Sequence, residues 1–280
     1  MAIKIDIHNH SRHGSFDGLR SYDEIATECR AKGLDVVVIT EHDTLTDTTV
    51  LAEVSARYGL LLLPGIEVSF DKWGHFLVLG GDEVLHTHCR RRCSKKQIVE
   101  HLDRLREKIV AWPEEYIRFE DFGRFAADLR AMFKGKHQNP ADFARAARAC
   151  GGYVSWAHPF VGSCLAKAFD CQVADDGAFD LPRFLSYLAE TEPEILEVAM
   201  AVDAFEGLNG RYPRRHSDLA CAFARLLDKP TTAGSDAHGE GEFGVAFMVV
   251  NANRTEVVDV ASLVQVLKNR ERSLEKREFS

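Results

Sequence analysis

Short apolar runs rich in β-branched residues alternate with amphipathic stretches along most of the chain. Apolar runs of about four to eight residues predict buried strands, and apolar residues repeated every three or four positions predict helices. The predicted strands are residues 3–7, 36–40, 60–68, 75–79, 153–156, 195–198, 231–233 and 245–250. The predicted helices are residues 21–31, 47–58, 94–110, 119–133, 140–149, 181–189, 213–227 and 255–267.

Repeated strand–helix units with no linker between them favour one α/β barrel domain over residues 1–280 rather than an open doubly wound sheet. The turn-like residues 71–74 predict that the strand at 75–79 pairs as a hairpin with the strand before it. Residues 81–139 interrupt the alternation with two long helices and a basic stretch at 90–96, so we expect a helical excursion there.

Composition narrows the class of protein. The chain is 45% hydrophobic and 28% charged, as in ordinary globular proteins, and its net charge of -8 excludes a global positive field for nucleic acid or anionic membranes. No apolar run approaches the ~18 residues of a membrane span. The opening MAIKIDIHNH lacks the apolar segment of a signal peptide. We therefore expect a cytoplasmic protein with reduced cysteines.

Four predicted strands run directly into metal-binding residue types. The clusters are His-Asn-His at 8–10, Glu-His-Asp at 41–43, Ala-His-Pro at 157–159 and Gly-Ser-Asp-Ala-His at 234–238. The carboxyl ends of barrel strands gather at one rim, so these residues are expected to converge. Imidazole and carboxylate groups are ligands for Zn, Mn or Fe, and the pattern predicts a shared metal site.

Three further residues have two interpretations each. Glu67 follows a buried run, where a carboxylate needs either a cation or a salt bridge to a neighbouring arginine. His75 either lies beside that strand end or is an ordinary packed or exposed histidine. Asp17, seven residues after His10, is either a site residue or a turn residue before a glycine, and His13 competes with it.

The ordered segments IDIHNHS, SFDG, ITEHD, PGIEVS, HFLVLG, WAHPF and AGSDAH resemble the PHP (polymerase and histidinol phosphatase) superfamily of metal-dependent phosphoesterases. The resemblance spans about residues 3–238 and implies a distorted (β/α)7 TIM-like barrel. It also implies two or three divalent metal ions (Mn, Fe or Zn) at the rim. The implied metal ligands are His8, His10, Asp17, His42, Glu67, His75, His158, Asp236 and His238. The expected catalytic residues among them are His8, His10, Asp236 and His238.

The segment from Glu197 to Arg211 resembles the EVxNGR segment of small stand-alone members, with an apparent insertion between Glu197 and Leu208. In one interpretation, Asn209 begins a turn before a helix that has Pro213 in its first turn. In the other, the planar guanidinium of Arg211 binds a substrate phosphate. The sequence leaves both open, and Arg211 is the expected substrate-binding residue.

The resemblance implies hydrolysis of a phosphate ester by hydroxide generated at clustered metals. The acidic net charge favours a small phosphate monoester, a phosphorylated metabolite or mononucleotide, over long nucleic acid. One alternative is a nuclease for short oligonucleotides, which a basic groove continuous with residues 90–96 would favour. The other is a metal-binding module without turnover. No P-loop is present, and no G-x-G-x-x-G motif follows a strand.

Overall fold

The computed structural model describes residues 2–15, 17–44, 46–81, 139–172 and 180–277. Its strands are β1 (Ile3–Asp6), β2 (Val36–His42), β3 (Leu61–Phe70), β4 (Gly74–Leu79), β5 (Tyr153–Trp156), β6 (Ala204–Asn209), β7 (Thr231–Gly234), β8 (Ala246–Val250) and β9 (Arg272–Lys276). Its α-helices are α1 (Tyr22–Ala31), α2 (Thr48–Tyr58), α6 (Pro140–Ala149), α7 (Cys164–Asp170), α8 (Leu181–Thr191), α9 (Pro193–Ala201), α10 (Arg214–Leu226) and α11 (Val260–Asn269). Two 3-10 turns are η1 (Asp71–Trp73) and η3 (Arg254–Glu256).

The strands form one mixed sheet in the order β7-β6-β5-β4-β3-β2-β1-β8-β9. Strand β4 is antiparallel to both β3 and β5, which confirms the predicted hairpin and distorts an otherwise parallel arrangement from β1 to β7. The end of β7 returns to β1, where Asn9 bridges Ala237 in parallel and Asp236 N donates to His8 O at 2.8 Å. The result is a nearly closed α/β barrel, as the sequence resemblance implies.

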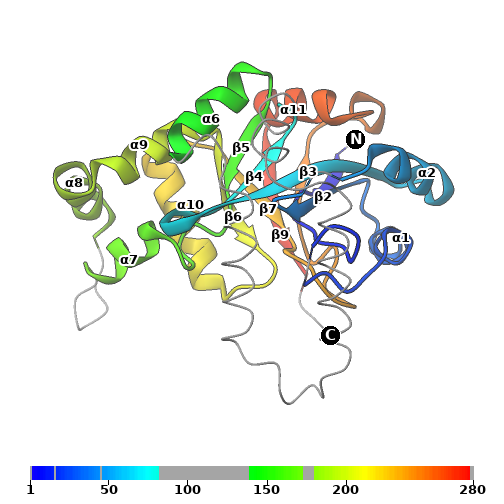
Figure 1. Ribbon diagram of the computed structural model, residues 1–280, viewed down its shortest axis with the longest axis horizontal. Coiled ribbons are helices and arrows are strands. Elements are labelled where there is room, and N and C mark those ends of the chain that lie inside the picture. Colours follow the sequence, from blue (N-terminus) through cyan, green and yellow to red (C-terminus); the bar gives the residue numbers. More distant parts are fainter. Residues whose placement is uncertain (1, 16, 45, 82–138, 173–179, 278–280) are drawn as a thin grey trace, which may run out of the picture.

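Helices cover the outside of the strands. Figure 1 shows α1 and α2 on one side of the sheet and α8, α9 and α10 on the other. The predicted ends of α1 are confirmed, since Ser21 caps it and its side chain pairs reciprocally with Glu24. No helix in the described part of the chain is long and apolar enough to cross a membrane.

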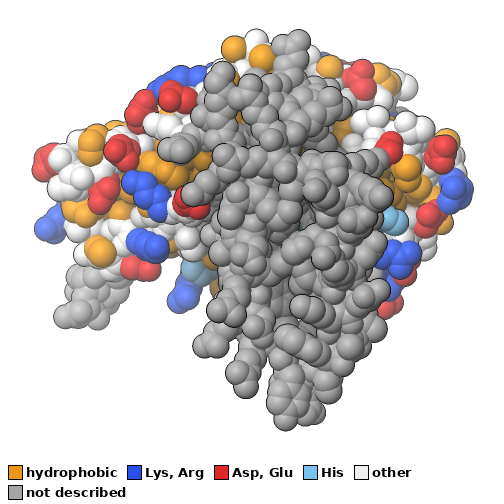
Figure 2. Space-filling model, in the orientation of Figure 1, with side chains coloured by type: hydrophobic (Ala, Val, Ile, Leu, Met, Phe, Trp, Pro, Cys, Tyr) orange, Lys and Arg blue, Asp and Glu red, His pale blue; other side chains and the backbone are white. Residues whose placement is uncertain are grey.

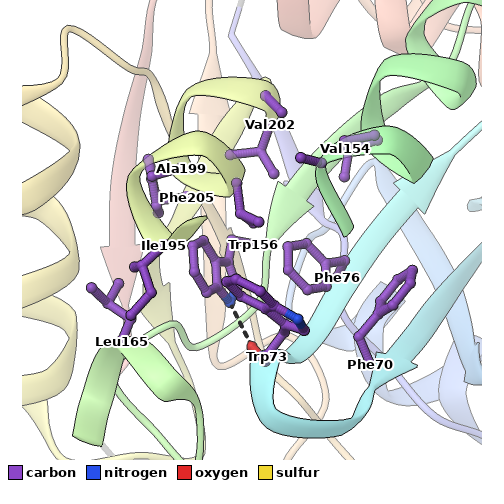
Figure 3. Packing of buried hydrophobic residues seen from close by; sticks show 14 of the residues in the cluster. Phe70, Trp73, Phe76, Val154, Trp156, Leu165, Ile195, Ala199, Val202 and Phe205 are labelled. Carbon is purple, nitrogen blue, oxygen red and sulfur yellow. Dashed lines mark hydrogen bonds between the residues drawn. The ribbon is translucent and has the colours of Figure 1, made fainter. Parts of the chain in front are cut away.

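Aromatic side chains fill the largest buried cluster, between the strands and α6, α7 and α9 (Figure 3). Trp156 is fully buried at its centre, with its ring stacked on Phe76 at a centroid distance of 5.2 Å. The indole N–H of Trp156 donates to the Trp73 carbonyl at 3.2 Å, so its one polar atom is satisfied. This packing holds β4, β5 and η1 together beneath the carboxyl end of β5.

The predicted strand at 195–198 is wrong, because these residues lie in α9. Short apolar runs do not distinguish a strand from a buried helix turn. Pro193 in the first turn and buried Ile195, Val198 and Ala199 fit a helix face. The strand that occupies this place in the barrel is β6, whose sequence AFEGLN interrupts its apolar residues with Glu206 and a glycine.

Other differences lie toward the chain's end. The helix predicted at 255–267 begins later, as α11, because Asp259 caps it and η3 precedes it. Helix α7 and strand β9 were not predicted from the sequence. The predicted excursion at 81–139, with its helices at 94–110 and 119–133 and its basic stretch at 90–96, lies almost wholly outside the described residues.

Charge is mixed over the surface seen in Figure 2. On that face, acidic and basic side chains of the described residues are interspersed with apolar ones. Within its described part, this face therefore presents no continuous field of one sign that would steer a charged ligand.

Candidate metal centre

The structure brings all nine predicted ligands together at the carboxyl end of the barrel. They come from the segment after β1, from β2, β3 and β4, and from the turns after β5 and β7. Four groups of three could each hold an ion, with ligand atoms within 4.8 Å of one another. The groups are His10/His42/His238, His8/His10/Asp236, His8/Glu67/His158 and His42/Glu67/His75.

The buried carboxylate of Glu67 lies in the middle of the cluster. Five histidines surround it, so a salt bridge to an arginine is not what satisfies this carboxylate in the described structure. The distances to Oε1 are 2.9 Å from His75 Nδ1, 3.2 Å from His158 Nε2 and 3.3 Å from His8 Nε2, and those to Oε2 are 2.8 Å from His42 Nδ1 and 3.3 Å from His10 Nε2. His75 therefore lies beside the end of β3, as its first interpretation requires.

Two aspartates complete the ring. Asp236 Oδ1 is 3.5 Å from Nε2 of both His8 and His10. Asp17 Oδ2 is 3.0 Å from His238 Nε2. The competing residue, His13, is exposed and its ring lies 4.5 Å from that of Tyr22 between centroids. The structure therefore directs Asp17, and not His13, at the cluster.

Neighbouring opposite charges keep His8 and Glu67 ionised at the centre although both are buried. Burial disfavours a charged His8, but Asp236 and Glu206 raise the pKa of this ring well above its usual value. Burial likewise disfavours an ionised Glu67, but His75 and His8 keep the pKa of its carboxyl well below its usual range. Carboxylates that stay ionised inside a protein are groups that a cation can bind.

Two buried ring nitrogens at the centre lack a hydrogen bond. His8 Nε2 and His10 Nε2 have no hydrogen-bond partner among the described residues. Each unsatisfied buried group costs about 1–3 kcal/mol. Imidazole nitrogens and carboxylate oxygens aimed at shared points are the donor set of Zn, Mn and Fe sites. The residues therefore fit divalent metal ions.

Family comparisons agree with this geometry. A model of the PHP domain matches residues 6–138, and a model described as PHP-associated matches residues 214–271. The chain is a PHP-domain protein. No curated protein sequence matches it.

Solved structures of similar fold include other PHP-like proteins. A two-domain protein from Bacteroides vulgatus, containing a predicted PHP-like metal-dependent phosphoesterase, has a TM-score of 0.52 at 18% identity. The alignment covers 99% of this chain and 65% of that one, so the chain spans about two thirds of that protein. An amidohydrolase from Chromobacterium violaceum with bound sulfate has a TM-score of 0.51 at 22% identity, covering 85% and 89%. PsfC from Pseudomonas syringae has a TM-score of 0.51 at 15% identity, covering 99% and 92%. At these identities the likeness concerns the fold.

A second layer of side chains aims the ligands of the PHP centre. Glu206 Oε1 lies 2.8 Å from His8 Nδ1, which leaves His8 Nε2 directed at the cluster. The other oxygen of Glu206 accepts from the backbone N–H of His158 at 2.8 Å and from Asn209 Nδ2 at 3.0 Å. A carboxylate behind a metal-binding histidine fixes its tautomer and orientation.

Sequence reasoning missed Glu206 because it aligned the family's EVxNGR pattern on Glu197. Glu197 lies in α9, half-exposed, with Arg145 Nη2 at 2.6 Å. Residues 206–211, EGLNGR, have the spacing of the pattern without any insertion, with Gly207 in place of its valine. The signal was therefore present in the sequence, but the wrong strand at 195–198 concealed it.

His10 is held by a different pair. Its Nδ1 lies 3.0 Å from the hydroxyl of Ser15, which donates to the buried carboxylate of Glu41 at 2.5 Å. Burial, together with the positive charges of His42 and His238, lowers the pKa of His10 to about 3. A neutral imidazole is the form that binds a metal. Sequence analysis did not single out Ser15, and it named Glu41 only as part of the cluster at 41–43.

The turn predicted at Asn209 is confirmed, while the binding of a substrate phosphate by Arg211 stays a prediction. Asn209 Oδ1 accepts from the backbone N–H of Arg211 at 2.9 Å and so begins a turn, while its Nδ2 donates to Asp236 Oδ2 at 3.2 Å. Arg211 is exposed, and its Nη1 donates to His238 Nδ1 at 2.8 Å. The guanidinium therefore lies at the rim of the PHP centre, with N–H groups left for another acceptor.

Backbone strain is concentrated at the same rim. His158 and Asp236 are non-glycine residues with positive φ, 27° and 53°, and Asp43 beside His42 has φ 48°. Such conformations cost about 1–3 kcal/mol each and persist only where the surroundings impose them. The barrel thus holds two candidate ligands in orientations that an unconstrained loop would not keep.

Proposed function

We propose that this PHP-domain protein hydrolyses a small phosphate monoester, a phosphorylated metabolite or mononucleotide, at two or three divalent metal ions. The observation that carries the proposal is the convergence of eight imidazole and carboxylate side chains on shared points, with Asp17 beside His238 and an arginine at the rim. Metal binding alone does not require an arginine at the rim. A phosphate ester, in contrast, is bound well by metal ions together with the planar hydrogen-bond donors of a guanidinium group.

The exposure of the ligands supports a small substrate. His8, His10 and Glu67 are fully buried, whereas the Asp17 and His75 side chains are 23% and 28% exposed. Solvent therefore reaches the centre on the side of Asp17 and His75. A buried centre open on one side suits the terminal phosphate of a compact molecule better than an internal phosphodiester of a long strand.

Metal ions bound by the four groups would polarise the phosphate and lower the pKa of water. Residues of this chain orient the metal ligands and the substrate. Glu206 and Ser15 fix the rings of His8 and His10, so that one nitrogen of each faces the centre. Arg211 binds the substrate phosphate through the guanidinium N–H groups that His238 does not use.

The test is hydrolysis by protein loaded with Mn, Fe or Zn. The substrates are p-nitrophenyl phosphate, its bis ester, histidinol phosphate, nucleoside bisphosphates and a short oligonucleotide. Release from monoesters alone supports the proposal. Cleavage of the bis ester or the oligonucleotide would identify a nuclease instead, and tight metal binding without turnover would identify a binding module.

Variants separate the site from the fold. We expect His10→Ala and Asp236→Ala to lower monoester hydrolysis at least about 100-fold, as for the loss of groups that stabilise a transition state, and Asp17→Ala to lower it as well. His13→Ala is the matched control from the same loop and should retain activity. Circular dichroism should show all four variants folded, because rim side chains contribute little to the core. Equal loss in His13→Ala and Asp17→Ala would contradict the assignment of Asp17.

A further inference from the structure

A groove lies on the outer wall of the barrel, away from the candidate metal ligands. It has a volume of about 840 Å³ and lies between α10 and β9, with parts of β6 and the start of β7 at its base. Ligand pockets for small molecules commonly have about 300–1,000 Å³. None of the nine candidate metal ligands lines it.

The lining of this groove is cationic, although the whole chain has a net charge of -8. Three acidic residues, Asp218, Asp228 and Glu271, also line it. The six basic residues that line it are Arg214, Arg225, Lys229, Arg270, Arg272 and Lys276. Local charge therefore opposes the charge of the molecule, which favours an anionic ligand.

Helix α10 and strand β9 form the two walls of the groove, and each presents its basic residues on one face. Arg214 and Arg225 lie on the stripe of α10 that also carries Cys221, while Arg272 and Lys276 occupy alternate positions of β9. Alternate strand residues share one face, and residues about one helical turn apart share one stripe. From residue 270 to residue 276 the wall is about 20 Å long, at roughly 3.3 Å per residue. Such a length offers contacts to several anionic groups in a row.

Two of the six cations are paired with carboxylates, Arg270 with Glu256 at 2.8 Å and Arg214 with Asp218 at 3.7 Å. Three others, Lys229, Lys276 and Arg272, have hydrogen bonds only to neutral groups. Lys229 Nζ donates to the carbonyls of Met200 and Val202, each at 2.7 Å, and Lys276 Nζ donates to the Asn209 carbonyl at 3.4 Å. Burial and the neighbouring cation Arg148 lower the pKa of Lys229. A bound anion would relieve the repulsion among these cations.

Arg272 adds an unsatisfied donor. Its Nη2 donates to the Tyr153 hydroxyl at 3.2 Å, whereas its Nη1 is buried and has no hydrogen-bond partner within the described ranges. Leu208 and Leu274, both half-buried, also line the groove and provide apolar surface between the cationic walls. The lining thus combines several phosphate-binding donors with room for a less polar body.

We propose that this groove is a second binding site, separate from the metal centre, for a nucleoside polyphosphate. The cationic walls bind the phosphates, and the leucine surface contacts the sugar or base. The site does not depend on hydrolysis at the metal centre, so it can be tested whether or not the proposed phosphatase activity is found.

The probe is β,γ-methylene ATP, a nucleoside triphosphate analogue, titrated calorimetrically into the metal-loaded protein. The test variants are Arg225→Glu and the milder Arg270→Gln, and the matched control is Arg183→Glu, an exposed arginine on α8. We expect Arg225→Glu to weaken binding roughly tenfold or more, Arg270→Gln to weaken it less, and Arg183→Glu to leave it unchanged. Added salt should weaken binding to the wild-type protein as well.

Two further arms locate the bound analogue and identify its class. In Asp236→Ala, which alters the metal centre, the binding that depends on Arg225 should persist. Binding that is lost in Asp236→Ala and kept in Arg225→Glu would overturn the proposal, because the analogue would then occupy only the metal centre. Tighter binding of a thymidine tetranucleotide than of the analogue would overturn it in favour of a nucleic-acid strand. Hydrolytic activity should be the same in Arg225→Glu and wild type.

Discussion

At the scale of single residues, the candidate ligands depend on side chains that do not face the centre. Each of the first two histidines has one ring nitrogen engaged from behind, His8 by Glu206 and His10 by Ser15. The opposite nitrogen of each ring is then left for a metal ion. A change in this second layer should therefore alter metal affinity without removing any ligand.

Glu206→Gln tests that dependence. The amide keeps the size of the side chain but removes the charge that orients His8 Nδ1, so we expect metal affinity to fall about 10–100-fold while the protein stays folded. Glu197→Gln is the matched control, since Glu197 is half-exposed on α9 and contacts Arg145. Competition with a fluorescent chelator measures both variants. Equal affinity in the two variants would show that Glu206 has no such role.

The difference between these glutamates also shows what the sequence could predict at this scale. The ligand histidines were found because each cluster directly follows an apolar strand. Glu206 follows no predicted strand and is of the same residue type as the surface glutamates, and only burial in the folded barrel gives it a different role. Glu41 does follow a predicted strand, but residue type alone did not show that it supports His10 through Ser15 instead of facing the centre.

At the scale of elements, the approach of β7 to β1 requires a glycine at 234. A Cβ at Gly234 would overlap the Cβ of His8 and lie 2.8 Å from its backbone nitrogen. Both atoms belong to His8, which is fully buried two residues after the end of β1. The close contact is therefore what brings Asp236, two residues later, to within 3.5 Å of His8 Nε2.

Gly234→Ala should lower both stability and metal affinity. Overpacking of this kind costs about 1–3 kcal/mol, which corresponds to roughly 2–4 °C in Tm per kcal/mol for a chain of this size. Gly239→Ala is the control in the loop that follows β7, because a Cβ there would meet Glu242 at an ordinary 3.5 Å. Thermal unfolding followed by circular dichroism compares the two. An unchanged Tm in Gly234→Ala would show that the contact between β7 and the segment after β1 can widen without loss of stability, which contradicts the prediction.

Most elements of the described chain could be predicted, and the error nearest the candidate site has a clear physical source. The apolar segment around Ile195 has the composition of a strand but forms α9, while β6 contains a buried glutamate and reads as a loop. A strand that supplies polar groups to a site carries residues that weaken its own apolar pattern. Pattern reasoning therefore fails at the element closest to the chemistry.

At the scale of the whole molecule, barrel closure makes one centre from distant segments. Asn9 and Ala237 pair in parallel although 227 residues lie between them, and Glu67 and His158 meet across the same rim. The order of the motifs and their positions after strands predicted this convergence. Closure of the barrel sets the distances between the ligands, places Asp17 rather than His13 at the centre and imposes the strained backbone of His158. The local hydrophobic pattern of the sequence does not predict these features.

Metal binding should therefore stabilise the entire barrel. Ions held by Glu67, Asp236 and their histidines bind the closed form, because the unfolded chain does not bring these residues together. At free metal about 100 times Kd, each independent site adds about 2.7 kcal/mol, so Tm should rise by roughly 5–10 °C over protein kept in chelator. Asp236→Ala should respond less, since it removes one of the four ligand groups. Equal Tm with Mn, Fe or Zn and with chelator in the wild-type protein would contradict a metal centre at this rim.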